Sequence, residues 1–530
     1  MYLVYNKASM SRWKPYFPLL LALLLALALK LILLIADVVP FNSDEAIVAL
    51  TARHILEGAR PIFFYGQAYM GTIDSYMIAV GFSLFGESVL VMRLMQTLIY
   101  LLFILSSWIL ALRLFSSYSI ANSAAFLAAL PPILVTTYTT PYFGTYGETL
   151  VFGNIILLLG FELITRKWQR SLIAWIGLGF IAGFAFWTFS LIVIYLFPIA
   201  LFGLWKHRQR LWVQYLVTAV GFFIGSSPWW WYNFNYEWVA WTSLVDPLIN
   251  QASFFHRLIG FFGLGVPALL GMRPPWQPEY YIWPIVLLAL VMYLLAILEV
   301  RRAWSQNGIS VDQDVVRLLF LFFSGFLLFF LGTERGIDST GRYLLPLFPL
   351  LIFLTALFVE IIKKQSSRVA LLTLIGFLSL NLSGTWISSQ SEDGITTQFD
   401  PITSFNNLHD DELIEFLNNN KISHGYTNYW VSYRLAFLSR ERLIFSPELP
   451  YKLEFLNYKG QVVAIPYYAW LADKSSHSAF ITTKHPDLDD FLRDRLFQLE
   501  VLYMEEQIGP YHIFYDLSEK VTPEQLGFAN

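Results

Sequence analysis

The 530-residue sequence contains no cysteine, which excludes disulfide bonds, thiolate nucleophiles and zinc sites built on thiolates. It is also poor in charge, since Asp, Glu, Lys and Arg make up 14% of the residues, against roughly a quarter in soluble domains. A formal net charge of −3 gives no electrostatic basis for binding nucleic acid. Hydrophobic residues make up 56% of the chain, so the composition indicates an integral membrane protein.

Long apolar runs recur along most of the chain and favour a polytopic α-helical membrane protein over a β-barrel. The first run is too long for the apolar region of a cleaved signal peptide and lacks a convincing cleavage site, so we interpret it as a retained anchor. Hydropathy predicts about eleven transmembrane helices, at approximately residues 17–36, 90–112, 119–140, 149–165, 171–187, 189–205, 212–230, 282–300, 317–332, 343–362 and 369–388.

Clusters of basic residues predict how these spans are oriented. With eleven spans, every cluster falls on the same side, and the positive-inside rule makes that side the cytoplasm. The opposite side then receives the segment 37–88, several loops and everything after about residue 390. The clusters are Lys7, Arg12 and Lys14; Arg166, Lys167 and Arg170; Lys206, Arg208 and Arg210; Arg301 and Arg302; and Lys363, Lys364 and Arg368.

The last part of the chain has a different character, because its charge density rises and no segment of it could span a bilayer. "DELIEFLNNN" and "DLDDFLRDRL" are typical of short helices, and "AFITT" is typical of a buried strand. The sequence therefore predicts two domains. Residues 1–390 form the transmembrane domain, with outer juxtamembrane helices at about 37–88, and residues 391–530 form a soluble, extracytoplasmic α/β domain.

The stretch "PFNSDEAIVALTARHILEG" presents Asp44 and Glu45 directly after the first predicted span. Asn42 and Glu45 have the spacing of a reciprocal helix cap, so capping of the helix N-terminus is one explanation for the two acids. Catalysis is the other, because a carboxylate at the membrane boundary could accept a proton from a substrate. Neighbouring residues on a helix point about 100° apart, so the two acids cannot aim at one atom. Under the catalytic hypothesis Asp44 is the base, and Glu45 orients the loop or the acceptor.

Further polar side chains collect in the predicted outer loops. Charges at the rim of a helical bundle are costly unless they are paired or face a wet cavity. Glu148 could instead cap a helix, and Arg342 could be an interfacial anchor. The aromatic run "SPWWWYNFNYEW" in the third outer loop fits an interfacial belt, sugar stacking or a lipid groove. The candidate catalytic residues are Asp44, Glu45 and Glu148, and the candidate substrate-binding residues are Arg342, Arg335, Gln67, Tyr69, Arg60, Tyr343 and Arg257.

Three patterns carry a resemblance to a known family. A juxtamembrane "DE" followed by two amphipathic interfacial helices is similar to GT-C fold glycosyltransferases. The stretch "GRYLLPLFPLL" resembles the "RY-x-x-P-x-x-P" of the protein O-mannosyltransferase and aminoarabinose-transferase group. The first-loop pattern and the tail's "GYTNYWVSYRLAFLSRERLIFSP" look like the Rgt-like bacterial glycosyltransferases of the same clan. The resemblance covers about residues 37–390 in topology.

The resemblance implies transfer of a sugar from a polyprenyl-phosphate donor to a glycan, lipid or protein acceptor, with inversion at the anomeric carbon. It places the active site on the outer face of the cytoplasmic membrane. Asp44 matches the family's catalytic aspartate, Glu45 and Glu148 match further acids, and Arg342 matches the arginine near the donor phosphate. Asn42 replaces the first acid of a D-x-D motif, so a divalent metal lacks a supporting motif and no cofactor is predicted with certainty.

Other classes of membrane protein remain as alternatives. A polytopic transporter or flippase would also have many spans, although such proteins usually carry ionisable residues or broken helices near the midplane. A polysaccharide polymerase or ligase would share the chemistry but not the fold, and a structural or receptor protein would act through its tail domain. Convergence of Asp44, Glu148 and Arg342 on one outer cavity would favour the enzyme.

Overall fold

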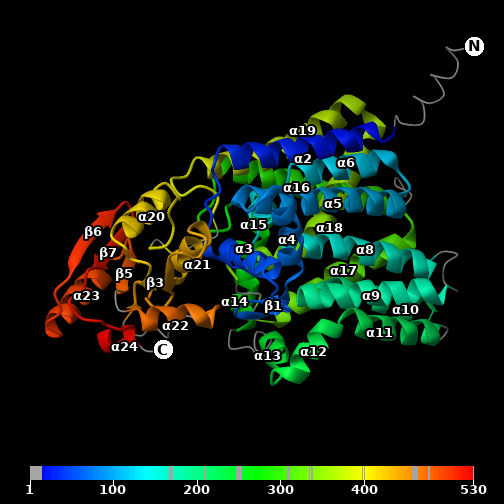
Figure 1. Cartoon of the computed structure of the whole chain (residues 1–530). Helices are drawn as coiled ribbons and strands as arrows, with labels where there is room; N and C mark the ends of the chain where they lie inside the picture. Colours follow the sequence, from blue (N-terminus) through cyan, green and yellow to red (C-terminus); the bar gives the residue numbers. More distant parts are fainter. Residues whose placement is uncertain are drawn as a thin grey trace, which may run out of the picture.

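In a computed structural model, a bundle of long helices carries at one end a smaller domain built on a β-sheet (Figure 1). The structure describes residues 15–165, 171–207, 211–245, 253–306, 311–333, 335, 338–396, 398, 400, 402–455, 463–475 and 478–528. Some basic residues used to predict the orientation lie outside this part of the chain, namely Lys7, Arg12, Lys14, Arg166, Lys167, Arg170, Arg208 and Arg210.

Every predicted span coincides with a helix or a helix pair of the bundle, which makes the chain a multi-pass membrane protein. Within the described ranges, eight helices are long and apolar enough to cross a bilayer. They are α2 (Phe17–Ile35), α5 (Val89–Phe115), α8 (Tyr146–Thr165), η2 with α10 (Ser190–Ile192 and Val193–His207), α16 (Trp283–Ser305), α17 (Gln313–Gly332), η7 with α18 (Arg342–Leu347 and Phe348–Gln365) and α19 (Ser367–Ser389).

The predicted span at 119–140 is a broken one. Helices α6 (Tyr118–Ala129) and α7 (Ile133–Thr139) meet at an angle of 70°. Pro131 and Pro132 lie at the break, and proline cannot donate the backbone hydrogen bond that would continue the helix. Buried Lys30 of α2 donates hydrogen bonds of 2.9 and 2.8 Å to the hydroxyls of Thr139 and Thr140, which fix the far end of α7.

The predicted spans at 171–187 and 212–230 form two shorter helices, α9 (Leu172–Thr188) and α11 (Trp212–Gly225). The structure therefore has eight full-length spans among its described residues, or nine with the bent pair, where the sequence predicted about eleven. The two helices touch through glycines, because a Cβ on Gly183 would lie 2.0 Å from the carbonyl oxygen of Phe222. Small residues spaced in this way allow membrane helices to approach closely.

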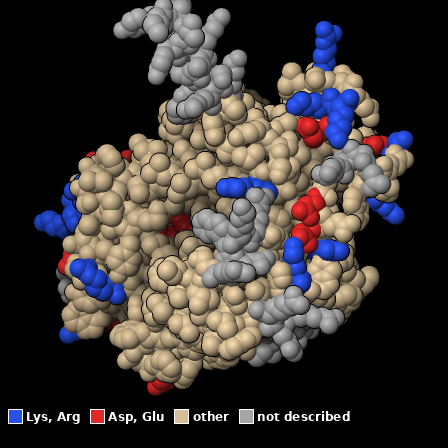
Figure 2. Space-filling view, turned by 90° about the vertical axis from the view of Figure 1, so that its right-hand side faces the viewer, with Lys and Arg blue, Asp and Glu red and all other residues tan. Residues whose placement is uncertain are grey.

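The helices alternate in direction, so the bundle has two chemically different ends. Basic residues lie in the last turns of α5, α10, α16 and α18, at the end far from the sheet domain. Figure 2 looks onto this end, where Lys and Arg side chains gather around the rim. The described members of this set are Arg113, Lys206, Arg302, Lys363 and Lys364.

The first outer segment folds as α3 (Ser43–Leu56), the hairpin β1 (Phe63–Phe64) and β2 (Gln67–Gly71), and α4 (Ile73–Phe85). The side chain of Asn42 accepts a 3.2 Å hydrogen bond from the backbone N–H of Glu45 and so caps α3. At the hairpin turn, Gly66 has φ +73°, and a Cβ there would lie 3.0 Å from Cα of Ala464. Another segment of the same chain thus approaches this glycine.

The third outer segment, predicted as an aromatic loop, is largely helical. It contains α12 (Ser227–Asn235), α13 (Val239–Val245), α14 (Phe254–Ile259), the π-helical turn η5 (Gly260–Gly265) and α15 (Val266–Leu269). Trp229 is buried against Phe186, with ring centroids 5.4 Å apart, whereas Trp231 and Phe234 are exposed. Exposed aromatic rings at this level are typical of an interfacial belt.

The C-terminal part of the chain forms a mixed five-stranded sheet in the order β4-β3-β5-β7-β6. The strands β3 (His424–Thr427), β4 (Ile444–Ser446) and β5 (Ser478–Thr483) are parallel, and β6 (Met504–Ile508) and β7 (Tyr511–Tyr515) add antiparallel pairs. Strand β5 is buried along its whole length, as its apolar sequence predicted. The accompanying helices are α20 (Asp410–Asn419), α21 (Tyr429–Leu438), α22 (Pro466–Lys474), α23 (Pro486–Gln498) and α24 (Pro523–Leu526).

The glycine contact between α9 and α11 gives a testable expectation. Gly183→Leu forces a side chain into the backbone of α11 and should lower the midpoint of thermal unfolding in detergent by several degrees, since overpacking costs about 1–3 kcal/mol. Gly177→Leu, in the same helix, is the matched control because a Cβ there meets no atom within 4 Å. Equal midpoints for both variants would contradict the close packing of these helices.

Candidate active site

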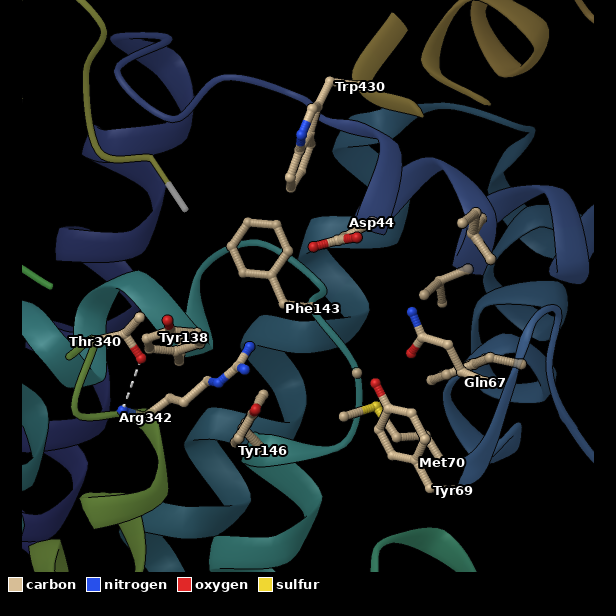
Figure 3. Close-up of a pocket in the computed structure, with 14 residues that line it drawn as sticks. Asp44, Gln67, Tyr69, Met70, Tyr138, Phe143, Tyr146, Thr340, Arg342 and Trp430 are labelled. Carbon is tan, nitrogen blue, oxygen red and sulfur yellow. Dashed lines mark hydrogen bonds between the residues drawn. The ribbon is translucent and has the colours of Figure 1, made fainter. Parts of the chain in front are cut away.

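A cavity of about 330 Å³ lies at the end of the bundle that faces the sheet domain (Figure 3). Its walls come from α3, the β1–β2 hairpin, the stretch from the end of α7 to the start of α8, the entry into α18, and α21 of the C-terminal part. The residues that line it are Asp44, Ile47, Val48, Phe64, Gln67, Tyr69, Met70, Tyr138, Phe143, Gly144, Tyr146, Thr340, Arg342 and Trp430. Apart from one carboxylate and one guanidinium, the lining is aromatic, aliphatic or uncharged polar.

Asp44 and Arg342 approach this cavity from different sides (Figure 3). Arg342 is oriented locally: its Nε donates a 3.0 Å hydrogen bond to Oδ2 of Asp338, and its backbone N–H donates to the hydroxyl of Thr340 at 3.2 Å. The guanidinium lies 5.0 Å from the ring centroid of Tyr343. Its side chain is 38% exposed, so the cation can meet a ligand in the cavity.

The environment of Asp44 makes its carboxylate a stronger base than a free aspartate. Burial raises its pKa, and the negative charge of Glu45 adds to this effect. A hydrogen bond from the Tyr429 hydroxyl to Oδ1, 2.6 Å long, and the positive charge of Arg342 act in the opposite direction. The balance leaves the pKa above its ordinary value, which brings the carboxylate closer to the range useful for general-base catalysis.

Glu45 points away from the cavity, as its helical offset from Asp44 predicts. It is fully buried, and its two oxygens accept hydrogen bonds of 3.0 and 2.6 Å from Nε and Nη2 of Arg93 on α5. The backbone N–H of Tyr142 donates to the same carboxylate at 3.0 Å, and Arg93 also donates to the carbonyl oxygen of Val39. Glu45 therefore ties α3 to α5 and to the segment that forms a wall of the cavity.

Glu148 lies in the first turn of α8 and is buried without lining the cavity. The hydroxyl of Tyr142 donates a 2.9 Å hydrogen bond to its Oε1. Asp74 of α4 is fully buried nearby, and neither of its oxygens has a partner among the described residues. Burial and the neighbouring Glu148 raise the pKa of Asp74 well above its usual range, which favours the protonated form.

Some of the other predicted residues line the cavity and others do not. Gln67 and Tyr69 line it, and burial raises the pKa of Tyr69 to about 12. Arg335 is 9% exposed and lies behind the cavity, with its guanidinium 5.3 Å from the ring centroid of Tyr343. Arg60 donates to the carbonyl oxygens of residues 55 and 59, and Arg257 lies on α14; neither lines the cavity.

Five aromatic or polar residues of the cavity were not among the predicted site residues: Tyr138, Phe143, Tyr146, Thr340 and Trp430. The first three reach the site because the broken span redirects the chain, and Trp430 comes from the C-terminal part. Single aromatic residues are common in membrane helices and loops, so neither their type nor their spacing distinguishes them. In the ranges described above, no three His, Cys, Asp or Glu side chains come together as metal ligands would.

Comparison with known proteins defines the class of this fold. Residues 72–232 match the family model for dolichyl-phosphate-mannose-protein mannosyltransferases, whereas no curated protein matches the chain. The structure is similar to ArnT from Cupriavidus metallidurans bound to undecaprenyl phosphate, with a TM-score of 0.56, 13% identity, and coverage of 93% of this chain and 98% of ArnT.

A second similar structure is the archaeal oligosaccharyltransferase AglB from Archaeoglobus fulgidus, in complex with an inhibitory peptide and a dolichol-phosphate. The TM-score is again 0.56, with 11% identity and coverage of 96% of this chain and 74% of AglB. Both similarities extend over nearly the whole chain. The protein has the GT-C fold, and the resemblance predicted from its sequence is confirmed at the level of the fold.

The buried ion pair of Glu45 and Arg93 predicts a large effect on stability. Glu45→Gln leaves Arg93 buried without its counter-charge and should destabilise the protein by about 3–5 kcal/mol, measured by denaturation in detergent. Glu57→Gln, at the exposed end of the same helix, should have little effect. Combining Glu45→Gln with Arg93→Gln should recover part of the loss. Similar midpoints for Glu45→Gln and Glu57→Gln would show that the pair is unimportant.

Proposed function

We propose that the protein is a glycosyltransferase that moves a sugar from a polyprenyl-phosphate donor to an acceptor on the extracytoplasmic face of the cytoplasmic membrane. The observation that carries this proposal is the placement of Asp44 and Arg342 in one cavity at the end of a GT-C bundle. That end lies opposite the basic helix termini, which are cytoplasmic under the positive-inside rule. A transporter would not require a base and a cation at one outer cavity.

Arg342 is the proposed partner of the donor phosphate. A guanidinium can contact two phosphate oxygens at once and stabilises the negative charge of a departing phosphate. Its hydrogen bond to Asp338 holds one edge of the guanidinium, and Figure 3 shows the other end directed into the cavity. ArnT and AglB, whose fold the chain shares, were solved with undecaprenyl phosphate and dolichol-phosphate. Arg335, behind Tyr343, would strengthen the positive potential.

An apolar cavity of about 660 Å³ suits the isoprenoid tail of such a donor. It is lined by side chains of η5, α15, α16, α17 and α18, almost all of them aliphatic or aromatic. Leu347, at the other end of the short helix η7 that begins at Arg342, belongs to this lining and connects the proposed phosphate position to the apolar cavity. A donor could therefore keep its chain within the bilayer region while its sugar reaches Asp44.

Asp44 is the proposed general base of an inverting transfer. Its Oδ2, which has no hydrogen-bond partner among the described residues, accepts the proton of the acceptor hydroxyl while that hydroxyl oxygen bonds to the anomeric carbon. The bond between the anomeric carbon and the phosphate oxygen breaks on the opposite face, and polyprenyl phosphate leaves with the electron pair. Attack and departure on opposite faces invert the anomeric configuration. Aromatic rings such as Phe143 and Trp430 at the cavity wall offer flat surfaces for sugar rings.

The base is tested by Asp44→Asn, which keeps the size of the side chain but removes proton acceptance. Transfer of radiolabelled sugar from polyprenyl phosphate to membrane acceptors should fall about 10²–10⁴-fold, while the protein still folds. Because burial raises the pKa of Asp44, the wild-type rate should decline as pH falls, beginning above the pKa of a free aspartate. If Asp44→Asn transfers sugar as fast as the wild type, helix capping would remain as the explanation for this acid.

The phosphate contact is tested by two substitutions of Arg342. Arg342→Lys keeps the charge but loses the forked contact, so the affinity for a donor analogue should fall; Arg342→Ala should lower it much further. Binding is measured in detergent with a polyprenyl-phosphate analogue. Arg60→Ala is the control, since Arg60 is exposed and does not line the cavity. Unchanged affinity and turnover in Arg342→Ala would make Arg342 an interfacial anchor.

A further inference from the structure

We propose that Tyr429 of the C-terminal domain is a positioning residue for sugar transfer, because its hydroxyl fixes the orientation of the Asp44 carboxylate. This inference rests on the proposed role of Asp44 as the base. It makes the C-terminal domain part of the transfer site, a role that neither the sequence of that domain nor its sheet indicates. The domain then contributes to turnover directly.

The contact between the two side chains is short and well enclosed. The Tyr429 hydroxyl donates to Oδ1 of Asp44 at 2.6 Å, and Tyr429 is only 6% exposed. Its ring packs edge to face against Trp430 and Tyr433, with centroids 5.2 and 5.5 Å apart. The phenol therefore has little freedom to move. With Oδ1 held in this way, Oδ2 is the oxygen left to accept the proton of the acceptor.

The helix that carries Tyr429 is fixed against the helix that carries Asp44. The Asn428 side chain accepts from the backbone N–H of Trp430 at 3.0 Å and caps α21 at its start. Farther along α21, the backbone N–H of Arg434 donates to the Ser43 hydroxyl at 3.4 Å. This second contact lies at the N-terminus of α3, next to Asp44. The position of the tyrosine is thus set by the docking of the domain and not by a flexible loop.

A second set of contacts secures the other end of this interface. Arg53, in the last turn of α3, forms an ion pair of 3.1 Å with Glu441, which follows α21. Nε2 of His54 lies 3.1 Å from the same carboxylate, and the Tyr468 hydroxyl donates to it at 2.7 Å. The two helices are therefore joined at both ends, and rotation of α21 relative to α3 would break several buried contacts.

The charged and titratable groups that face Asp44 come from four elements. Glu45 lies on its own helix, Arg342 on η7, Tyr69 on β2 and Tyr429 on α21. Of these, Tyr429 forms the hydrogen bond to the carboxylate among the described contacts. Burial and the nearby Asp44 raise the pKa of Tyr429 well above its usual range, so the phenol keeps the hydrogen that it donates. That bond opposes the rise in the pKa of Asp44 caused by burial.

Tyr429→Phe tests the inference, because it keeps the ring and removes the hydroxyl. Loss of a hydrogen bond to a charged group should lower kcat about ten- to hundredfold, with little change in the KM for the donor. The acid limb of the pH–rate profile should also move to higher pH, since the carboxylate loses a group that favours its charged form. A misplaced but folded domain would expose Asp44 to water, and because burial is the main cause of its raised pKa, the limb would then move to lower pH.

Tyr433→Phe is the matched control. Tyr433 lies one turn later on α21 and is also buried, but its hydroxyl accepts from the backbone N–H of Ala464 within the C-terminal domain. The two variants lose one buried hydroxyl each from the same helix. Tyr433→Phe should therefore lower thermal stability and leave the pH–rate profile unchanged. If Tyr429→Phe does not fold, Tyr429→Met, which fills the space without a donor, replaces it.

The outcomes separate this inference from the proposed function. If Asp44→Asn is inactive but Tyr429→Phe keeps the wild-type kcat and pH profile, the role of Tyr429 is overturned and Asp44 remains the base. Fully active Asp44→Asn would overturn the base and the inference that rests on it. A shifted acid limb in Tyr429→Phe, with an unshifted one in Tyr433→Phe, would establish the hydroxyl as the positioning group.

Discussion

The buried ion pair of Glu45 and Arg93 is the constraint on which the geometry of the site depends. Two charges removed from water are tolerated only when each is satisfied, and here Arg93 also reaches the carbonyl of Val39 while Glu45 accepts from Tyr142. The pair therefore fixes the rotation of α3 about its axis. Because Asp44 is the preceding residue on that helix, fixing Glu45 inward directs Asp44 into the cavity.

The cavity is assembled from segments that lie far apart in the sequence, and each reaches it for a local reason. Two prolines break the span between α6 and α7, and the bent chain brings Tyr138 and Phe143 to the wall. A local hydrogen bond to Asp338 sets the direction of Arg342. The bundle thus supplies a rigid frame, and irregular backbone at its outer end supplies the side chains, an arrangement tolerated where the backbone is buried in protein.

Much of this arrangement was predictable, for physical reasons that differ between residues. Hydropathy located the long helices of the bundle because membrane burial demands long apolar runs, although the span that it predicted at 212–230 is longer than α11. Asp44 and Arg342 stood out because a charged side chain at the rim of a helical bundle is costly unless it is paired or faces a wet cavity. Tyr429 and Trp430 did not, because their importance arises from domain docking, which leaves no periodic or compositional trace.

The contact between Asp44 and Tyr429 spans 385 positions of the chain and has a consequence for biosynthesis. Ribosomes make the N-terminal part first, so α3 and its acid leave the membrane long before the tyrosine is synthesised. Until α21 emerges and docks, Asp44 lacks its hydrogen-bond donor and the cavity lacks one wall. A nascent or truncated chain would therefore hold an incomplete site, which only the docking of the C-terminal domain would complete.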